Sequence, residues 1–217
     1  MKRTCSILVV ALIALFVSHA SLAGEAPMTI QLPQPQMQGG RPLMQVLKER
    51  SSKRSFSSEK LPLQVLSNLL WAAFGINRPE SGHRTAPSAK NWQEIDIYVA
   101  MAEGLYLYDA KSNQLHKILS EDIRAMTGTQ PFVKDAPINL VYVADNSRMS
   151  NASQDEAERY SAADTGFIAE NVYLYCASER LATVVRGSVP REELARAMKL
   201  RPEQHIILAQ TVGYPGQ

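Results

Sequence analysis

The sequence predicts an α+β fold, and three stretches carry that prediction. Ile, Val and Met occupy every second position of residues 95–101, as in a strand with one buried face. Residues 138–144 are apolar apart from Asn139, which is typical of a central strand covered on both faces. Residues 157–181 carry apolar side chains at helical spacing. Because helices and strands do not alternate regularly, the mixture indicates α+β.

The first 23 residues have the features of a secretory signal peptide. Lys2 and Arg3 precede an apolar run at 7–17, and small residues end at Ala23. We therefore expect cleavage after Ala23 and a periplasmic or secreted protein with no stable membrane anchor. A retained anchor is the alternative, but the apolar run is shorter than the ~20 residues of a spanning helix.

Loss of this leader changes the charge and the cysteine content. The chain has 23 Lys and Arg against 21 Asp and Glu, and removing Lys2 and Arg3 makes the two equal. A mature chain without net charge gives no reason to expect a nucleic-acid partner. Cys176 is then the one remaining cysteine, so an intramolecular disulfide is excluded and a small core residue is expected.

The N-terminal half divides into a linker and the start of a domain. Residues 24–41 are rich in Pro, Gln and Gly and predict a linker or arm before a domain at 42–217. A short apolar face follows at 43–47. Residues 62–74 predict a helix, because Pro stands at its start and Gly75 just past its end. Residues 76–92 read as a polar loop.

The C-terminal half adds a hairpin, two helices and two strands. Residues 105–108 and 115–119 flank a probable turn, residues 121–127 favour a short helix, and 183–185 a short strand. A helix at 190–198 and a strand at 205–212 complete the chain. The 157–181 helix has one wide apolar stripe, which predicts burial at a subunit interface, and its members are Phe167, Ile168, Val172, Tyr175 and Cys176.

The common catalytic motifs are missing. The sequence has no phosphate-binding P-loop, no H-E-x-x-H pair, no G-x-S-x-G elbow and no dinucleotide fingerprint. His83, His116 and His205 are too scattered to predict a metal site. With so little acid–base machinery, a bound cofactor would have to supply any demanding chemistry.

Residues 50–56, Arg-Ser-Ser-Lys-Arg-Ser-Phe, place three cations and three hydroxyls close together. Guanidinium and hydroxyl donors are what a phosphate monoester requires. A solvated basic loop whose serines cap helices is the other interpretation, and composition alone leaves both open.

Five sequence patterns in a fixed order resemble the nitroreductase family of flavin mononucleotide (FMN) enzymes. R-x-S-x-R-x-F is present as Arg50, Ser52, Arg54 and Phe56, and the others are R-T-A-P-S-A at 84–89, G-L-Y-L-Y-D at 104–109, Q-x-x-x-x-x-A-P at 130–137 and V-G-Y-P at 212–215. Within the family, the chain is most similar to the branch of thiazoline/oxazoline oxidases. The resemblance implies a nitroreductase-like domain with a mixed or antiparallel sheet flanked by helices, in a homodimer.

The resemblance also implies roles for the basic segment. Arg50 and Ser52 would hold the FMN phosphate, and Ser51 would contribute its main chain. Arg54 would approach the pyrimidine edge of the flavin, where a cation stabilises the charge of the reduced ring.

Other residues would line the flavin ring itself. Pro87, Ser88 and Ala89 would do so from the partner subunit, with Asn91 and Gln130 as polar contacts. Arg186 and Gly187 would present backbone N–H groups toward N5 and O4, where hydride is transferred.

Two departures from the family concern the phosphate site. Many members have G-L-G where this chain has Arg180-Leu181-Ala182, and many place a cation beyond the final strand. This chain has no basic residue after Arg201, so either the phosphate would be held less tightly or Lys53, Lys90 or a partner residue would substitute.

Three functional hypotheses follow from the resemblance. The first is an exported FMN oxidoreductase that moves hydride through N5 between a small donor and an organic acceptor. The second is an azoline-type dehydrogenase or oxidase, and the third a non-catalytic flavin-binding protein.

Overall fold

The structure is a computed structural model that describes residues 29–216. The predicted leader at 1–23, its cleavage site and the first part of the predicted linker, at 24–28, lie outside the described residues. Within 29–216, none of the helices combines the length and apolar character needed to cross a membrane.

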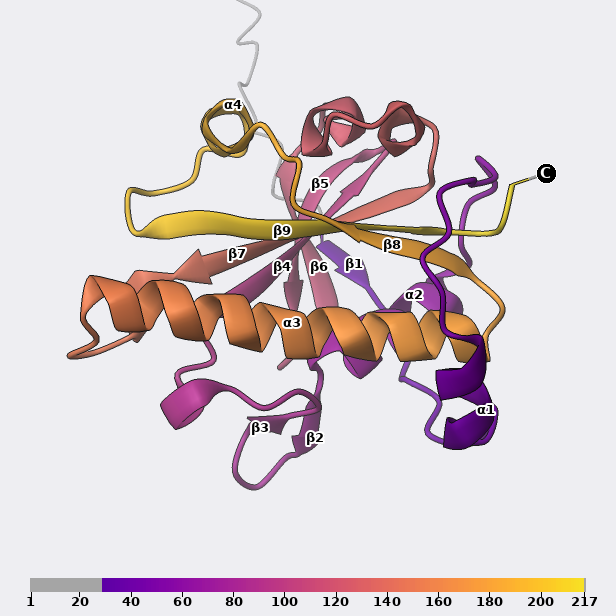
Figure 1. Cartoon of the computed structure of the whole chain (residues 1–217), viewed down its shortest axis with the longest axis horizontal. Coiled ribbons are helices and arrows are strands. Elements are labelled where there is room, and N and C mark those ends of the chain that lie inside the picture. The colour runs from indigo at the N-terminus through magenta and orange to yellow at the C-terminus, as the bar shows by residue number, and fades with distance from the viewer. Residues whose placement is uncertain (1–28, 217) are drawn as a thin grey trace, which may run out of the picture.

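A seven-stranded antiparallel sheet forms the middle layer of the molecule (Figure 1), in the order β1-β6-β5-β4-β7-β9-β8. The α+β prediction is confirmed, and every pairing in the sheet is antiparallel. The strands are β1 (Thr29–Gln31), β4 (Ile95–Met101), β5 (Gly104–Asp109), β6 (Gln114–Leu119), β7 (Ile138–Asp145), β8 (Ala182–Arg186) and β9 (Gln204–Gly213).

Helices cover both faces of this sheet. The long helix α3 (Gln154–Ser178) runs along one face together with α2 (Leu63–Phe74), and α1 (Leu43–Glu49) packs against α3 (Figure 1). The short helix α4 (Arg191–Ala197) and the 3₁₀ turn η2 (Arg124–Thr127) lie on the opposite face. Three further 3₁₀ turns are η1 (Ala89–Asn91), η3 (Pro131–Lys134) and η4 (Asn146–Arg148).

The central strand β7 contributes to a hydrophobic core on each face of the sheet. Leu140 and Tyr142 belong to the larger core beneath α2 and α3, while Val141 and Val143 belong to the smaller core beneath α4. Successive side chains of a strand point to opposite faces. The apolar run at 138–144, which only Asn139 interrupts, is therefore explained by two covered faces, as predicted.

The helix α3 begins and ends three residues before its predicted bounds. Its start is a capping box in which Ser153 and Glu156 each accept a backbone N–H of the other. These cap residues are polar, so apolar periodicity could not locate them. The predicted stripe also divides: Ile168, Val172 and Cys176 are buried, whereas Phe167 is 48% exposed. The single chain therefore buries only part of the stripe, and its burial at a subunit interface stays a prediction.

Two segments predicted as irregular contain strands. Within the predicted linker, β1 pairs with β6, and Leu32 just after it is buried. Within the predicted 76–92 loop, β2 (Ile76–Arg78) and β3 (His83–Arg84) form a small separate hairpin. Each strand is two or three residues long, which is too short for an alternating pattern to stand out.

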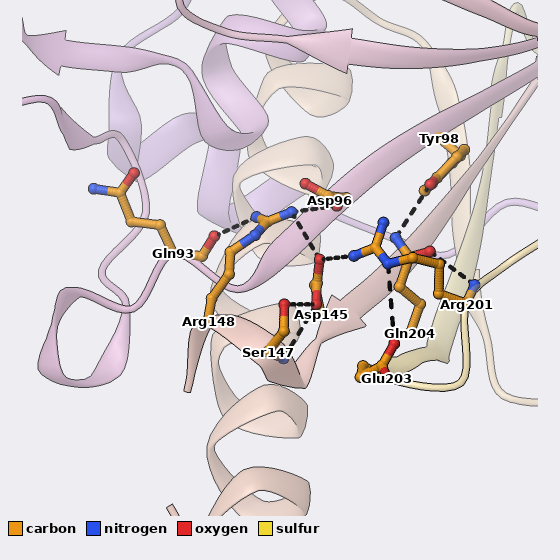
Figure 2. A network of polar contacts seen from close by, with 9 residues as sticks. All are labelled: Gln93, Asp96, Tyr98, Asp145, Ser147, Arg148, Arg201, Glu203 and Gln204. Atoms are coloured by element: carbon orange, nitrogen blue, oxygen red, sulfur yellow. Dashed lines mark hydrogen bonds and ion pairs between the residues drawn. The ribbon is translucent and has the colours of Figure 1, made fainter. Parts of the chain in front are cut away.

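A network of ion pairs and hydrogen bonds connects several segments at the carboxyl end of β7 (Figure 2). Asp145 accepts from Arg201 Nη2 at 2.5 Å and from the Ser147 backbone at 3.1 Å, and Arg148 Nη2 lies 3.6 Å away. Arg148 also reaches Asp96 on β4. This network ties β4, β7 and the segment before β9 together where α3 begins.

Candidate functional site

The basic segment at 50–56 runs beside the edge strand β8. The Lys53 N–H donates to the Thr183 carbonyl at 2.9 Å, and Phe56 forms a bridge with Pro215 beyond β9. Phe56 also contacts Phe132, with ring centroids 5.2 Å apart. These contacts place the first and the last of the sequence patterns side by side.

Tyr173 on α3 organises the start of this segment. Its hydroxyl accepts from the Val185 N–H at 2.9 Å and lies 2.8 Å from Ser52 Oγ. The Arg50 guanidinium lies over its ring, 5.3 Å from the centroid. When Tyr173 gives its one hydrogen to Ser52, the Ser52 hydrogen remains available to an anion. The predicted pair Arg50 and Ser52 is thus brought together by a residue that the sequence patterns did not indicate.

Two other residues of the segment, Ser51 and Lys53, lie at a small cavity next to Arg180. Ser51 and Lys53 line a small cavity of about 80 Å³ that is also lined by Glu49 and Arg180. Arg180 stands where many family members have the first glycine of G-L-G. In this chain it adds a cation near Lys53. Arg54 is exposed, with no hydrogen bond or ion pair recorded to another residue of 29–216.

The outer edge of β8 carries the predicted backbone donors. Thr183 and Val185 turn their carbonyl and N–H outward, to Lys53 and Tyr173. Backbone groups alternate in direction along an antiparallel strand. Gly187 is therefore the next residue whose N–H faces outward, and this N–H has no hydrogen bond to residues 29–216. By the same alternation Arg186 turns its backbone toward β9, so its part in the site comes from its side chain.

The Arg186 side chain is buried with 5% of the residue exposed, and its hydrogen-bond partners are all neutral. No carboxylate within 29–216 pairs with it. Burial lowers the pKa of Arg186 to about 10, so the guanidinium still carries its charge at neutral pH. The acceptors are the Thr127 carbonyl at 2.7 Å, Asn139 Oδ1 at 3.0 Å, Thr211 Oγ1 at 3.1 Å, and Gln130 Oε1 and Thr127 Oγ1, each at 3.5 Å.

Gly128 provides the space for this guanidinium. An ideal Cβ at Gly128 would overlap Arg186 Nη1 and approach Gln130 Oε1 to 2.8 Å. The φ of Gly128 is 175°, which any residue adopts, so the requirement is one of volume. The sequence indicated Gly128 only as the end of a short helix. Its contact with Arg186 could not be predicted, because the two residues are far apart in the sequence.

The residues predicted to line the flavin from the partner subunit form a separate group. The Ala89 N–H donates to Asp164 Oδ2 at 2.8 Å, and Ser88 Oγ donates to Glu94 Oε2 at 3.2 Å. Asp164 lies nine residues before Tyr173 on α3, which is about 13 Å along the helix axis. One chain therefore does not bring Pro87, Ser88, Ala89 and Asn91 to Arg50 and Ser52.

A buried acid pair supports this second group. Glu94 is fully buried, Asp164 is 2% exposed, and Glu94 Oε1 has no hydrogen-bond partner within 29–216. Burial, together with the nearby Asp164 carboxyl, raises the pKa of Glu94. Glu94 therefore takes up a proton more readily than a solvated glutamate, which eases the repulsion between the two carboxyls.

Other chemistry is sparse in the described part of the chain. Residues 29–216 contain no cluster of three His, Cys, Asp or Glu side chains suited to a metal ion. Cys176 is buried, and burial raises the pKa of its thiol. An apolar cavity of about 340 Å³ between β1, α2 and the β4–β5 turn contains none of the predicted site residues.

Comparison with known proteins gives consistent matches over most of the chain. The model of the Nitroreductase family matches residues 47–214. A protein of Methanocaldococcus jannaschii, provisionally named a nitroreductase, is 33% identical in an alignment 181 residues long that covers 79% of this chain and 90% of that protein.

Solved structures share the fold. A crystal structure from Ralstonia eutropha, also provisionally named a nitroreductase, is 46% identical with a TM-score of 0.84, covering 87% of this chain and 90% of that one. A Desulfovibrio desulfuricans structure determined in complex with FMN has 21% identity and a TM-score of 0.60, over 82% of this chain and 89% of that one. The latter likeness concerns the fold alone.

Proposed function

This chain belongs to the nitroreductase family, and on that premise we propose that it is an exported FMN-dependent oxidoreductase. Members of the family are oxidoreductases that typically bind FMN, and the structural relative from Desulfovibrio was solved with it. When bound, FMN would supply hydride transfer at N5 between a small donor and an organic acceptor.

The observation that carries this proposal is the set of donors along the outer edge of β8. At one end stand the Ser52 hydroxyl and the Arg50 guanidinium, held by Tyr173. At the other end stands the Gly187 N–H, which has no hydrogen-bond partner in the described part of the chain. Cations and a hydroxyl suit the phosphate, and a fixed backbone N–H suits the polar edge of the ring. The donor set of this chain therefore fits FMN, with Arg50, Ser51 and Ser52 at the phosphate side and Arg54 and Gly187 toward the ring.

A homodimer would complete the site. The short helix α1 exposes three large apolar side chains, with Leu43 60%, Met44 75% and Leu47 47% exposed, and Phe167 on α3 is 48% exposed. Exposed apolar side chains of this size on neighbouring helices suit a subunit interface. Because Pro87 to Asn91 lie far along α3 from Arg50, a partner is the source from which they would reach the flavin.

The location bears on the electron donor. A leader at 1–23 would place the protein away from the cytosolic pools of NADH and NADPH. The sequence has no dinucleotide fingerprint that would capture nicotinamide tightly. We therefore expect slow reduction by NADH and NADPH and faster reduction by a quinol, a reduced carrier protein or an oxidisable substrate.

The phosphate assignment is tested by FMN titration of the mature protein. Replacing Arg50 with Ala removes a charge-assisted contact of about 1.5–3 kcal/mol, so affinity should fall at least tenfold. Lys53→Ala and Arg180→Ala are matched controls, because both cations line the neighbouring cavity. Equal losses in all three variants would contradict the assignment of Arg50.

Stopped-flow reduction then separates the functional hypotheses. Bleaching of the bound flavin by a donor, followed by reoxidation by an organic acceptor, would support the oxidoreductase. Bleaching by an azoline substrate would instead favour the dehydrogenase or oxidase. A yellow protein that no donor reduces would be a flavin-binding protein without turnover.

A further inference from the structure

Arg186 is a buried cation without a counter-ion among residues 29–216. A charge is costly to bury unless it is paired, and the usual partner of a buried guanidinium is a carboxylate. Here five neutral oxygens surround the group and Gly128 leaves room for it. Neutral acceptors satisfy the N–H groups but leave the positive charge uncompensated, so it acts on whatever binds nearby.

The contact with Gln130 fixes the direction of an amide. Arginine has five donors and no acceptor, so only the Gln130 Oε1 atom can face it. The Gln130 NH₂ group is therefore turned away from Arg186, and it has no hydrogen-bond partner within 29–216. Gln130 is only half-buried, which leaves this donor accessible.

The loop that carries Gln130 is tied to the end of β8. The Thr129 N–H donates to the Ser188 carbonyl at 3.3 Å, one residue past Gly187. Two neighbouring segments thus offer N–H donors that lack protein partners: the Gln130 amide and the Gly187 backbone.

We propose that Arg186 is a positioning residue for the reduced cofactor, which it serves in two ways. Through Gln130 it presents an N–H donor beside that of Gly187, and its uncompensated charge favours the form of the flavin that carries negative charge. This inference rests on the proposed function, since it assumes FMN along the β8 edge. Its measurable consequence is a higher midpoint potential of the bound flavin.

A purely structural role is the competing explanation. Arg186 joins β8 to β7, through Asn139, and to η2, through Thr127, and those contacts alone would stabilise the fold. A structural tie depends on hydrogen bonds, whereas the proposed role depends on net charge and on the direction of the amide. A variant that adds a carboxylate beside the guanidinium separates the two.

Gln130→Glu is that variant, because a Glu carboxylate would pair with Arg186 and replace the outward amide donor. In the mature holoprotein we expect the ratio of reduced to oxidised FMN affinity to fall about tenfold, which lowers a two-electron midpoint potential by about 30 mV. Thermal stability should stay the same or rise. Gln114→Glu is the matched control, since it adds the same charge on β6, at the other end of the sheet, and should leave the potential unchanged.

Asn139→Asp provides an independent test, because it places a carboxylate where Asn139 Oδ1 now lies 3.0 Å from Arg186 Nη2. The potential should fall again, without any change at Gln130. An unchanged potential in a folded, FMN-loaded Gln130→Glu protein would overturn the inference, and a fall in stability alone would show a structural tie. If the wild-type protein bound no FMN, the proposed function itself would fail, and this inference with it.

Discussion

The two ends of strand β7 handle charge in opposite ways. At its carboxyl end, Asp145 lies among the guanidiniums of Arg148 and Arg201, both of which reach solvent. Near its start, Asn139 offers a neutral oxygen to Arg186, which is buried. The first arrangement is a charge-compensated ion-pair network at the edge of the sheet. The second keeps a cation uncompensated beside the strand edge where we place the cofactor.

The difference teaches how to separate stabilising from functional charge in this fold. Ion pairs near solvent contribute little and are replaceable, since water screens them. A cation held only by neutral dipoles needs complete hydrogen bonding and a fitted space. Changes that displace the Arg186 guanidinium from its acceptors should therefore cost more stability than changes at the Asp145 end.

The largest effect should come from Gly128→Ala. The added methyl would overlap Arg186 Nη1, so the guanidinium must shift and lose acceptors. We expect a loss of about 3 kcal/mol in the free energy of unfolding, measured by urea denaturation.

Gly166→Ala is its matched control. Gly166 lies inside α3, and a Cβ there would meet nothing within 4 Å. Alanine should stabilise the helix by about 0.5–1 kcal/mol. Similar losses at both glycines would show that the space at Gly128 has no special role.

A smaller effect is expected for Asp145→Asn. Burial would raise the pKa of Asp145, but hydrogen bonds from Ser147 and the charges of Arg148 and Arg201 lower it overall. The folded state therefore favours the carboxylate, and its stabilisation is present above the unfolded pKa of about 3.9 and lost as pH falls through the folded value.

The difference between wild type and Asp145→Asn should thus be about 1–3 kcal/mol at pH 7 and should vanish in acid. Urea denaturation at pH 7 and at stepwise lower pH measures it. If the difference in unfolding free energy grew in acid, Asp145 would not stabilise the fold as a carboxylate.

The smallest effect is expected for Arg148→Gln. Its side chain is 37% exposed, and Asp145 keeps Arg201 as a partner when Arg148 is removed. We expect a loss below about 1 kcal/mol, reduced further by added salt. A loss as large as that of Gly128→Ala would remove the contrast between the two ends of β7.

The sequence predicted which helices and strands form better than it predicted the residues at which they begin and end. Strand β4 agrees with its predicted bounds, and β7 extends one residue further, to Asp145. The shift of α3 arises because Ser153 and Glu156 form its cap through side chains that carry no apolar signal. Strand β1 was missed because its partner, β6, is distant in the chain, and local composition showed only a linker.

The parts of the candidate site that lie within family sequence patterns could be predicted. The segment 50–56, Gly187 and Gln130 came from family patterns, and the structure gives each a defined neighbour. Tyr173 was missed because its partner Ser52 lies 121 residues away. The burial of Arg186 was also missed, since an arginine at the end of a short strand ordinarily predicts a solvated side chain.

The way β8 is closed also limits how copies of this protein can associate. An edge strand with open N–H and C=O groups invites another chain to extend the sheet. Along β8, the Thr183 carbonyl is taken by Lys53 and the Val185 N–H by a tyrosine hydroxyl, so no continuous ladder is offered. Edge-to-edge growth into larger aggregates is thereby discouraged on this side, and association is left to the exposed helical surface.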